Sequence, residues 1–128
     1  MAINDFEHQH QVAFFQLVEI KLLKKFPFLD KLLFAVPNGG QRSKSQGGKL
    51  KAEGVKRGVS DIILLHPQGN YGFLCIEMKH GKNKPDDEQR DFAIRVKMNG
   101  NGCYYVCYSS QEAMKCLQWY LNGATLNK

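Results

Sequence analysis

Two acidic residues and a lysine lie at the ends of two apolar segments. Asp61 begins the segment DIILL at residues 61–65, and Glu77 and Lys79 end the segment YGFLCIEMK at residues 71–79. Both segments are short and rich in β-branched, aromatic and other apolar residues, which is typical of strands. The stretch between them carries the turn-forming residues Pro67, Gly69 and Asn70. The pattern predicts two strands joined by a turn, with charged groups at one end.

An antiparallel hairpin centred on Gly69 would bring the two acids together. The numbers of paired residues then add to 138, so Asp61 lies opposite Glu77, with Cβ atoms about 5 Å apart. Lys79 is two residues from Glu77 and therefore shares its face of the sheet. A slip of one residue in the register would send the two acids to opposite faces.

Two opposed carboxylates repel each other, and burial makes that repulsion more costly. A divalent cation would reverse the effect, because carboxylate oxygens and water are the ligands that Mg²⁺ and Mn²⁺ prefer. Two other interpretations remain open. Asp61 could cap a strand or form a salt bridge, and Glu77 with Lys79 could be an exposed ion pair at a strand end.

Most of the positive charge is concentrated in residues 37–60. The chain has a formal net charge of +6. This segment sets one acid, Glu53, against the basic residues Arg42, Lys44, Lys49, Lys51, Lys56 and Arg57. A basic cluster favours a polyanionic partner, and nucleic acid is the first expectation. The alternative is a solvated loop and helix face without a partner.

The composition fits one domain over residues 1–128, since 128 residues suffice for one core. No apolar run reaches the ~18 residues of a membrane span, and the N-terminus does not resemble a secretory signal. We therefore expect a cytoplasmic protein. The four cysteines form no C-x-x-C pair, so buried reduced thiols are a better expectation than a zinc site.

Helical and strand patterns alternate along the chain. Helices are expected at 4–25, 49–55, 85–98 and 111–121, and strands at 32–36, 61–65, 71–79 and 103–108. This order predicts an α/β domain with a mixed sheet. The nearly continuous apolar segments DIILL and FLCI indicate that helices cover both faces of that sheet.

The spacing of Asp61 and Glu77-Met78-Lys79 resembles the core of the PD-(D/E)XK nucleases, with Ser60 where that motif often has proline. A longer pattern is similar to the VRR-NUC family within that group, in its short standalone form found in phages and bacteria. It comprises Pro37-Asn38-Gly39-Gly40, Arg42, residues 48–55, Gly58-Val59-Ser60-Asp61, Glu77-x-Lys79 and Gln89.

The resemblance implies a restriction-endonuclease-like fold and metal-dependent hydrolysis of DNA. Asp61, Glu77 and the main-chain carbonyl of Met78 would bind Mg²⁺ or Mn²⁺. Lys79 would orient or help deprotonate the attacking water, or stabilise charge on the phosphate. The six basic residues of segment 37–60 would contact the DNA backbone. The resemblance further implies cleavage of branched DNA, especially Holliday (four-way) junctions, by a homodimer.

Two further residues have two interpretations each. Gln89 corresponds to a glutamine that faces the site in the family, yet Asp86 and Gln89 also have the spacing of a capping box. The resemblance places Glu7 as a further metal ligand, with Gln11 one turn later, yet Glu7 could instead form a capping box with Asn4. His80 follows Lys79 directly and could contact a phosphate or remain solvated.

Three functions compete at this point. The first is a Mg²⁺- or Mn²⁺-dependent endonuclease specific for branched DNA. The second is a nickase, flap nuclease or exonuclease that acts on simpler DNA. The third is a nucleic-acid-binding module without catalysis, which would gain nothing from carboxylates that face a phosphate.

Overall fold

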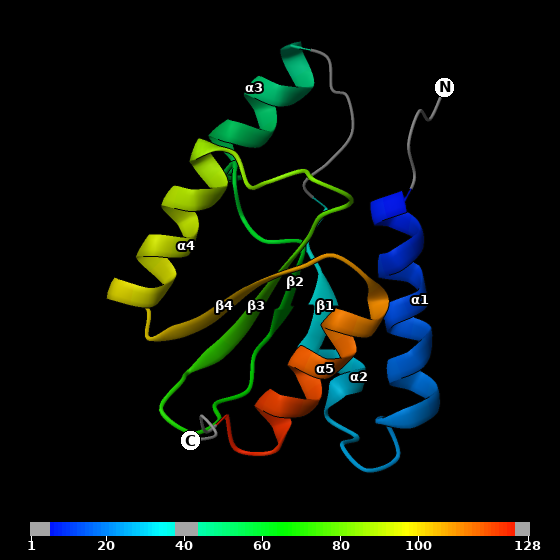
Figure 1. Ribbon diagram of the computed structural model, residues 1–128. Coiled ribbons are helices and arrows are strands. Elements are labelled where there is room, and N and C mark those ends of the chain that lie inside the picture. The colour runs from blue at the N-terminus through cyan, green and yellow to red at the C-terminus, as the bar shows by residue number, and fades with distance from the viewer. Residues whose placement is uncertain (1–5, 38–43, 125–128) are drawn as a thin grey trace.

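The computed structural model describes residues 6–37 and 44–124, except for the side chains of residues 44 and 45 (Figure 1). The elements in chain order are α1 (Phe6–Lys21), α2 (Leu29–Leu32), β1 (Leu33–Ala35), α3 (Lys44–Ala52), β2 (Ile62–Leu64), β3 (Phe73–Met78), α4 (Asp87–Asn99), β4 (Gly102–Cys107) and α5 (Ser110–Leu121). Apart from the single turn α2, each is an element that the sequence predicts, with shifted ends.

The four strands form one mixed sheet in the order β1-β2-β3-β4. The β1–β2 and β2–β3 pairs are antiparallel, and β3 and β4 are parallel. Helix α4 makes the crossover that a parallel pair requires. The predicted register of the hairpin is confirmed, because Ile62 pairs with Ile76 and Leu64 with Leu74.

Helices cover both faces of the sheet, as Figure 1 shows. On one face α1 and α5 pack over the main core, which includes Phe14, Leu74, Ile76, Leu117 and Tyr120. On the other face α4 covers a smaller cluster built on Cys75, Val96 and Tyr104. Five of the six residues of β3 are buried, so the predicted burial of this strand on both sides is confirmed.

Some element ends differ from the prediction. The first helix ends at Lys21, and the next four residues form a turn, although apolar residues continue there. Helix α3 begins at Lys44 and contains Gly47 and Gly48, which the sequence prediction leaves outside the helix because glycine disfavours it. The single-turn helix α2 is too short to produce a periodic pattern.

The four cysteines are free thiols, and Cys75, Cys103 and Cys107 are buried. This agrees with the expected reduced, core-forming role. Within residues 6–37 and 44–124, no helix is both long and apolar enough to cross a membrane.

Candidate active site

The two acids meet at the end of the sheet where β2 begins and β3 ends, which is the upper end in Figure 1. Asp61 directly precedes β2, and its carbonyl accepts a 2.7 Å hydrogen bond from the N–H of Val36. This bond continues the β1–β2 pairing by one residue and holds the backbone of Asp61 in line with the strand. The Asp61 carboxylate then accepts the Met78 N–H at Oδ2, over 2.8 Å. Asp61 is therefore fixed from both neighbouring strands.

Glu77 is the most deeply buried charged residue of this site, with 1% of its surface exposed. Its Oε2 accepts a 3.0 Å hydrogen bond from Nε2 of Gln89 and lies 3.5 Å from Nζ of Lys79. Its Oε1 is also buried and meets no hydrogen-bond donor among the described residues, although the Asp61 carboxyl is close enough to share a proton with Glu77. A buried carboxylate oxygen without a partner is unfavourable, so this atom marks a place where a ligand would be stabilising.

The two carboxyl groups perturb each other strongly. Burial raises the pKa of Glu77 from 4.5 to about 8, and the neighbouring charge of Asp61 adds to the rise, while Lys79 opposes it. Burial also raises the pKa of Asp61, the Met78 N–H lowers it, and the charge of Glu7 raises it by a smaller amount. The pair therefore holds a proton near neutral pH that a bound cation would displace.

Lys79 lies beside Glu77, on the same face of the sheet, as the alternation of strand side chains predicts. Its backbone N–H donates to the carbonyl of Cys107 over 2.9 Å, which extends the β3–β4 pairing by one residue. Its side chain is 13% exposed, so the ammonium group is largely shielded from water. Such an ammonium group interacts more strongly with a nearby anion than an exposed one does.

Gln89 makes the contacts that both interpretations of the sequence require. Its backbone N–H donates to Oδ1 of Asp86, and its side-chain Oε1 accepts the N–H of Asp86, both over 2.9 Å. These two bonds form the capping box of α4. The remaining amide group, Nε2, donates to Glu77. The helix cap therefore fixes the orientation of the amide that contacts the buried acid.

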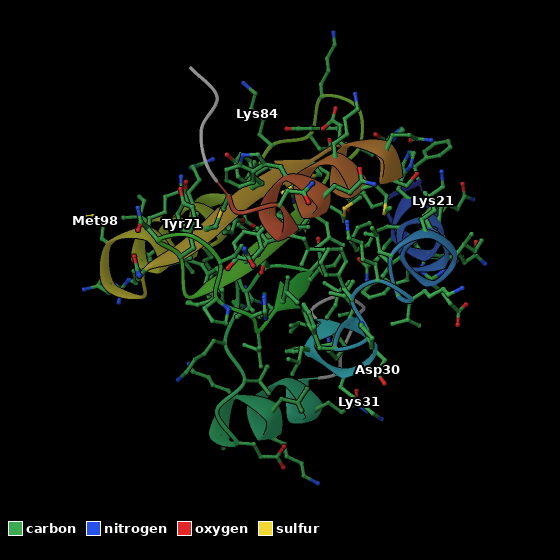
Figure 2. The ribbon with its side chains drawn as sticks, turned by 90° about the horizontal axis from the view of Figure 1, so that it is seen from below. Lys21, Asp30, Lys31, Tyr71, Lys84 and Met98 are labelled. Atoms are coloured by element: carbon green, nitrogen blue, oxygen red, sulfur yellow. The ribbon has the colours of Figure 1, made fainter. Side chains whose placement is uncertain are left out.

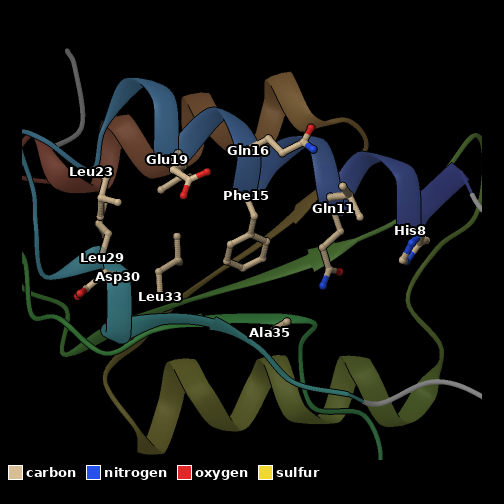
Figure 3. Close-up of a pocket in the computed structure, with 12 residues that line it drawn as sticks. His8, Gln11, Phe15, Gln16, Glu19, Leu23, Leu29, Asp30, Leu33 and Ala35 are labelled. Carbon is tan, nitrogen blue, oxygen red and sulfur yellow. The ribbon is translucent and has the colours of Figure 1, made fainter.

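Glu7 lies in the first turn of α1, and its charge reaches Asp61. It is not gathered with Asp61 and Glu77 into a close group, because no three acidic, histidine or cysteine side chains within the described ranges are placed to hold a metal. Asn4, its proposed capping partner, lies outside the described residues. Gln11 lines a cavity of about 530 Å³ between α1, α2 and β1, and Asp61, Glu77 and Lys79 do not line it (Figure 3).

The residues fit a hard divalent cation in part. Asp61 and Glu77 supply carboxylate oxygens, and Oε1 of Glu77 lacks a partner. Met78 directs its N–H toward Asp61, and in an extended strand the carbonyl of the same residue points the same way, so this oxygen also lies on the Asp61 side. Oxygen ligands of this kind suit Mg²⁺ and Mn²⁺, which commonly complete their coordination with water.

The basic segment lies next to the same end of the sheet. The residues that follow α3 reach the beginning of α4 through Arg57 and Gly58. Lys49, Lys51, Lys56 and Arg57 are exposed. Arg57 lies 3.5 Å from Glu88, but both side chains are largely exposed, so this ion pair contributes little to stability. Arg42 and the side chain of Lys44 lie outside the described part of the chain.

Gly58 explains how this segment reaches α4. Its φ of +85° is in the region that favours glycine, and a Cβ built there would lie 2.5 Å from the carbonyl oxygen of Glu88. The backbone therefore passes against the first turn of α4 just before Asp61. Sequence reasoning did not anticipate this contact, although an isolated glycine ahead of a strand is a known signal of close backbone approach.

Sequence reasoning also missed an aromatic contact at the other side of the site. The rings of Phe6 and His80 are stacked, with centroids 4.3 Å apart, and His10 lies 6.2 Å from His80. The contact joins the start of α1 to the segment that follows β3. The sequence carries no signal for this pairing, since 74 positions separate the two residues.

Comparison with known proteins places these features in context. The VRR-NUC domain family matches residues 16–111 of the chain, a range that includes Asp61, Glu77, Lys79 and Gln89 but neither Glu7 nor Gln11. A solved structure described as "VRR_NUC domain protein" is similar with a TM-score of 0.72 and 24% sequence identity, over 91% of this chain and 88% of that one. No curated protein matches the chain.

Proposed function

Since this chain belongs to the VRR-NUC family, a family of nucleases, we propose that it is a metal-dependent endonuclease that cleaves branched DNA. The observation that carries the proposal is the buried pair of Asp61 and Glu77, with Lys79 and Gln89 at one oxygen of Glu77 and no partner at the other. Two adjoining buried carboxyls are costly to a fold without a ligand, and a bound cation would remove that cost. A binding module would gain nothing from acids that repel the phosphates of its ligand.

Each residue has a separate task in this proposal. Asp61 and Glu77, with the carbonyl of Met78, would hold Mg²⁺ or Mn²⁺. The bound ion would polarise the scissile phosphate and activate water. Asp61 is aligned by the Met78 N–H, and Gln89 keeps Glu77 oriented from the helix cap. The metal role of Glu7 remains a proposal that requires a movement of its side chain toward Asp61.

Lys79 would act on the phosphate or on the attacking water. Its ammonium lies 3.5 Å from Glu77 and is largely shielded from solvent. At such a position it can stabilise the charge that develops on the phosphate, and it can orient a water molecule for attack. Alternatively, Lys79 would help to deprotonate the attacking water.

The DNA substrate is assigned from the charge distribution and from the family. The exposed residues Lys49, Lys51, Lys56 and Arg57 would contact the backbone beside the site, together with Arg42 and Lys44. Such contacts carry little sequence information and suit an enzyme that selects DNA by its shape. Two symmetric cuts in a four-way junction require two sites, which a two-fold homodimer would supply.

The test is a cleavage assay with labelled four-way junction, flap, single-stranded and linear duplex DNA, each in Mg²⁺, Mn²⁺ or EDTA. Lys79→Ala is compared with Lys21→Ala, which removes a lysine at the far end of α1. We expect paired cuts in the junction, lost in EDTA and reduced about 100-fold or more by Lys79→Ala only.

Each other outcome has a definite meaning. Cutting that favours flaps, ends or single nicks would retain the site and exclude the junction resolvase. Absence of metal-dependent cutting on every substrate would exclude the nuclease and favour a binding module.

A further inference from the structure

The segment that follows Lys79 is a second basic surface beside the site. Residues 80–84 read His-Gly-Lys-Asn-Lys, and we call them the 80–84 loop. Lys82 and Lys84 are exposed, and neither forms a salt bridge within the part of the chain that the structure describes. These two lysines are outside the basic segment at residues 37–60.

Two contacts with other elements and one internal turn hold the 80–84 loop in place. His80 stacks on Phe6 at the start of α1, with 4.3 Å between ring centroids. The hydroxyl of Tyr108 donates to the carbonyl of Asn83 over 2.9 Å, which fastens the loop to the end of β4. Within the loop, the N–H of Asn83 donates to the carbonyl of His80, and Gly81 supplies the positive φ of +62°. The loop is a fixed turn that projects its two lysines.

The acids that follow the loop form no salt bridge with these lysines within the described residues. Asp86 accepts the N–H of Gln89 in the capping box. Asp87 pairs with Arg90, and Glu88 pairs with Arg57. Each acid at the start of α4 thus has its closest contact with another group, and the ammonium groups of Lys82 and Lys84 stay accessible to a ligand.

The loop and α3 lie on opposite sides of the sheet (Figure 2). Both are at the end of the sheet where β3 ends (Figure 1). Seen from below, Lys84 lies at one edge of the molecule and α3 at the opposite edge, with the sheet between them (Figure 2). A nucleic-acid backbone that runs from α3 to the loop therefore crosses the sheet end that carries Asp61 and Glu77.

We propose that Lys82 and Lys84 bind phosphates of double-stranded DNA on the side of the cleavage site opposite to α3. The inference rests on the proposed function, because it needs a DNA backbone in the site. Its physical basis is that a strand held on one side only could pivot about that contact. Contacts on both sides fix the scissile phosphate over the carboxylates.

The test measures binding of a fluorescent four-way junction in EDTA, between 50 and 200 mM KCl. Three double variants each remove two positive charges. They are Lys82→Gln with Lys84→Gln in the loop, Lys49→Gln with Lys51→Gln in α3, and Lys21→Gln with Lys31→Gln as the control. The control lysines lie at the ends of α1 and α2.

Removal of one lysine that binds a phosphate makes the slope of log K against log[salt] shallower by about 0.9. The slope of the loop variant should therefore be shallower than that of wild type by about 1.8. Between 50 and 200 mM salt, wild-type affinity should then fall about 12-fold more than that of the loop variant. The control variant should keep the wild-type slope.

The outcomes separate this inference from the function on which it rests. A slope of the loop variant that is shallower than the slope of the control variant by about 0.9 or more supports the inference. A loop slope equal to the control, with a changed α3 slope, overturns the inference and leaves the proposed function intact. Equal slopes in all three variants, with wild type still bound to the junction, overturn the inference alone. Failure of wild type to bind the junction overturns both.

Discussion

The protonation of Glu77 predicts an unusual effect on stability. In the metal-free protein the pKa of this buried carboxyl is about 8, compared with an ordinary value of 4.5. The substitution Glu77→Gln keeps the shape of the side chain and an oxygen that can accept the Gln89 amide, but it removes the ionisable group. We therefore expect the variant to be more stable than wild type near neutral pH in EDTA.

The sign and the size follow from proton linkage. A carboxyl with a raised pKa binds its proton more tightly in the folded state. Its contribution to stability is complete below about pH 4.5 and is lost progressively as the pH rises to about 8. Each unit of difference between the folded and unfolded pKa corresponds to about 1.4 kcal/mol of folding free energy. At pH 7 wild type should therefore be less stable than Glu77→Gln by about 3 kcal/mol, and near pH 4 the difference should become small.

Urea denaturation of both proteins in EDTA, at pH 4 to 8, measures this difference directly. The comparison cancels the groups that titrate alike in both proteins, so the difference reports on Glu77 together with its coupled neighbour Asp61. Glu53→Gln is the matched control, because Glu53 is exposed and its removal should give a small difference at every pH. A wild-type minus Glu77→Gln difference that stays constant with pH, or that favours wild type as the pH rises, would refute the reasoning.

Three further predictions concern the surroundings of the acid pair. Gln89→Ala and Asp86→Ala each disrupt the α4 cap and should each lower the free energy of unfolding by about 1 kcal/mol. The cleavage rate should be lower in Gln89→Ala than in Asp86→Ala; equal cleavage rates would mean that Gln89 acts only as a helix cap. In thermal melts, Gly58→Ala should lose at least about 1 kcal/mol more stability than Gly54→Ala, because of these two glycines only Gly58 lies against a carbonyl oxygen. Equal losses of stability would exclude a clash at Gly58. At limiting Mg²⁺, the cleavage rate should rise up to about pH 8, since Glu77 must lose its proton to bind metal; a rate independent of pH below 8 would contradict this.

The central hairpin could be predicted from sequence because its information is local. Two apolar segments flank a turn with Gly69, which has a positive φ, and the pairing that follows is the observed one. Proximity of Asp61 and Glu77 then follows from strand geometry alone. The cap of α4 could equally be predicted from the spacing of Asp86 and Gln89.

Other features depend on contacts between distant segments. The stack of Phe6 on His80 and the approach of Gly58 to α4 arise from packing that no local pattern encodes. From sequence, the cap of α4 and the contact with the site were two alternative interpretations of Gln89. A single amide has both a donor and an acceptor, and only the three-dimensional arrangement shows that both are used.

Calorimetric titration of Mn²⁺ into metal-free protein at pH 7 tests the central claim most directly, in two buffers of different ionisation enthalpy. The account predicts binding to wild type with release of about one proton, because Glu77 is mostly protonated at this pH. It also predicts loss of that binding in Glu77→Gln. Absence of Mn²⁺ binding to wild type, or equal binding by the variant, would contradict a metal site at Asp61 and Glu77.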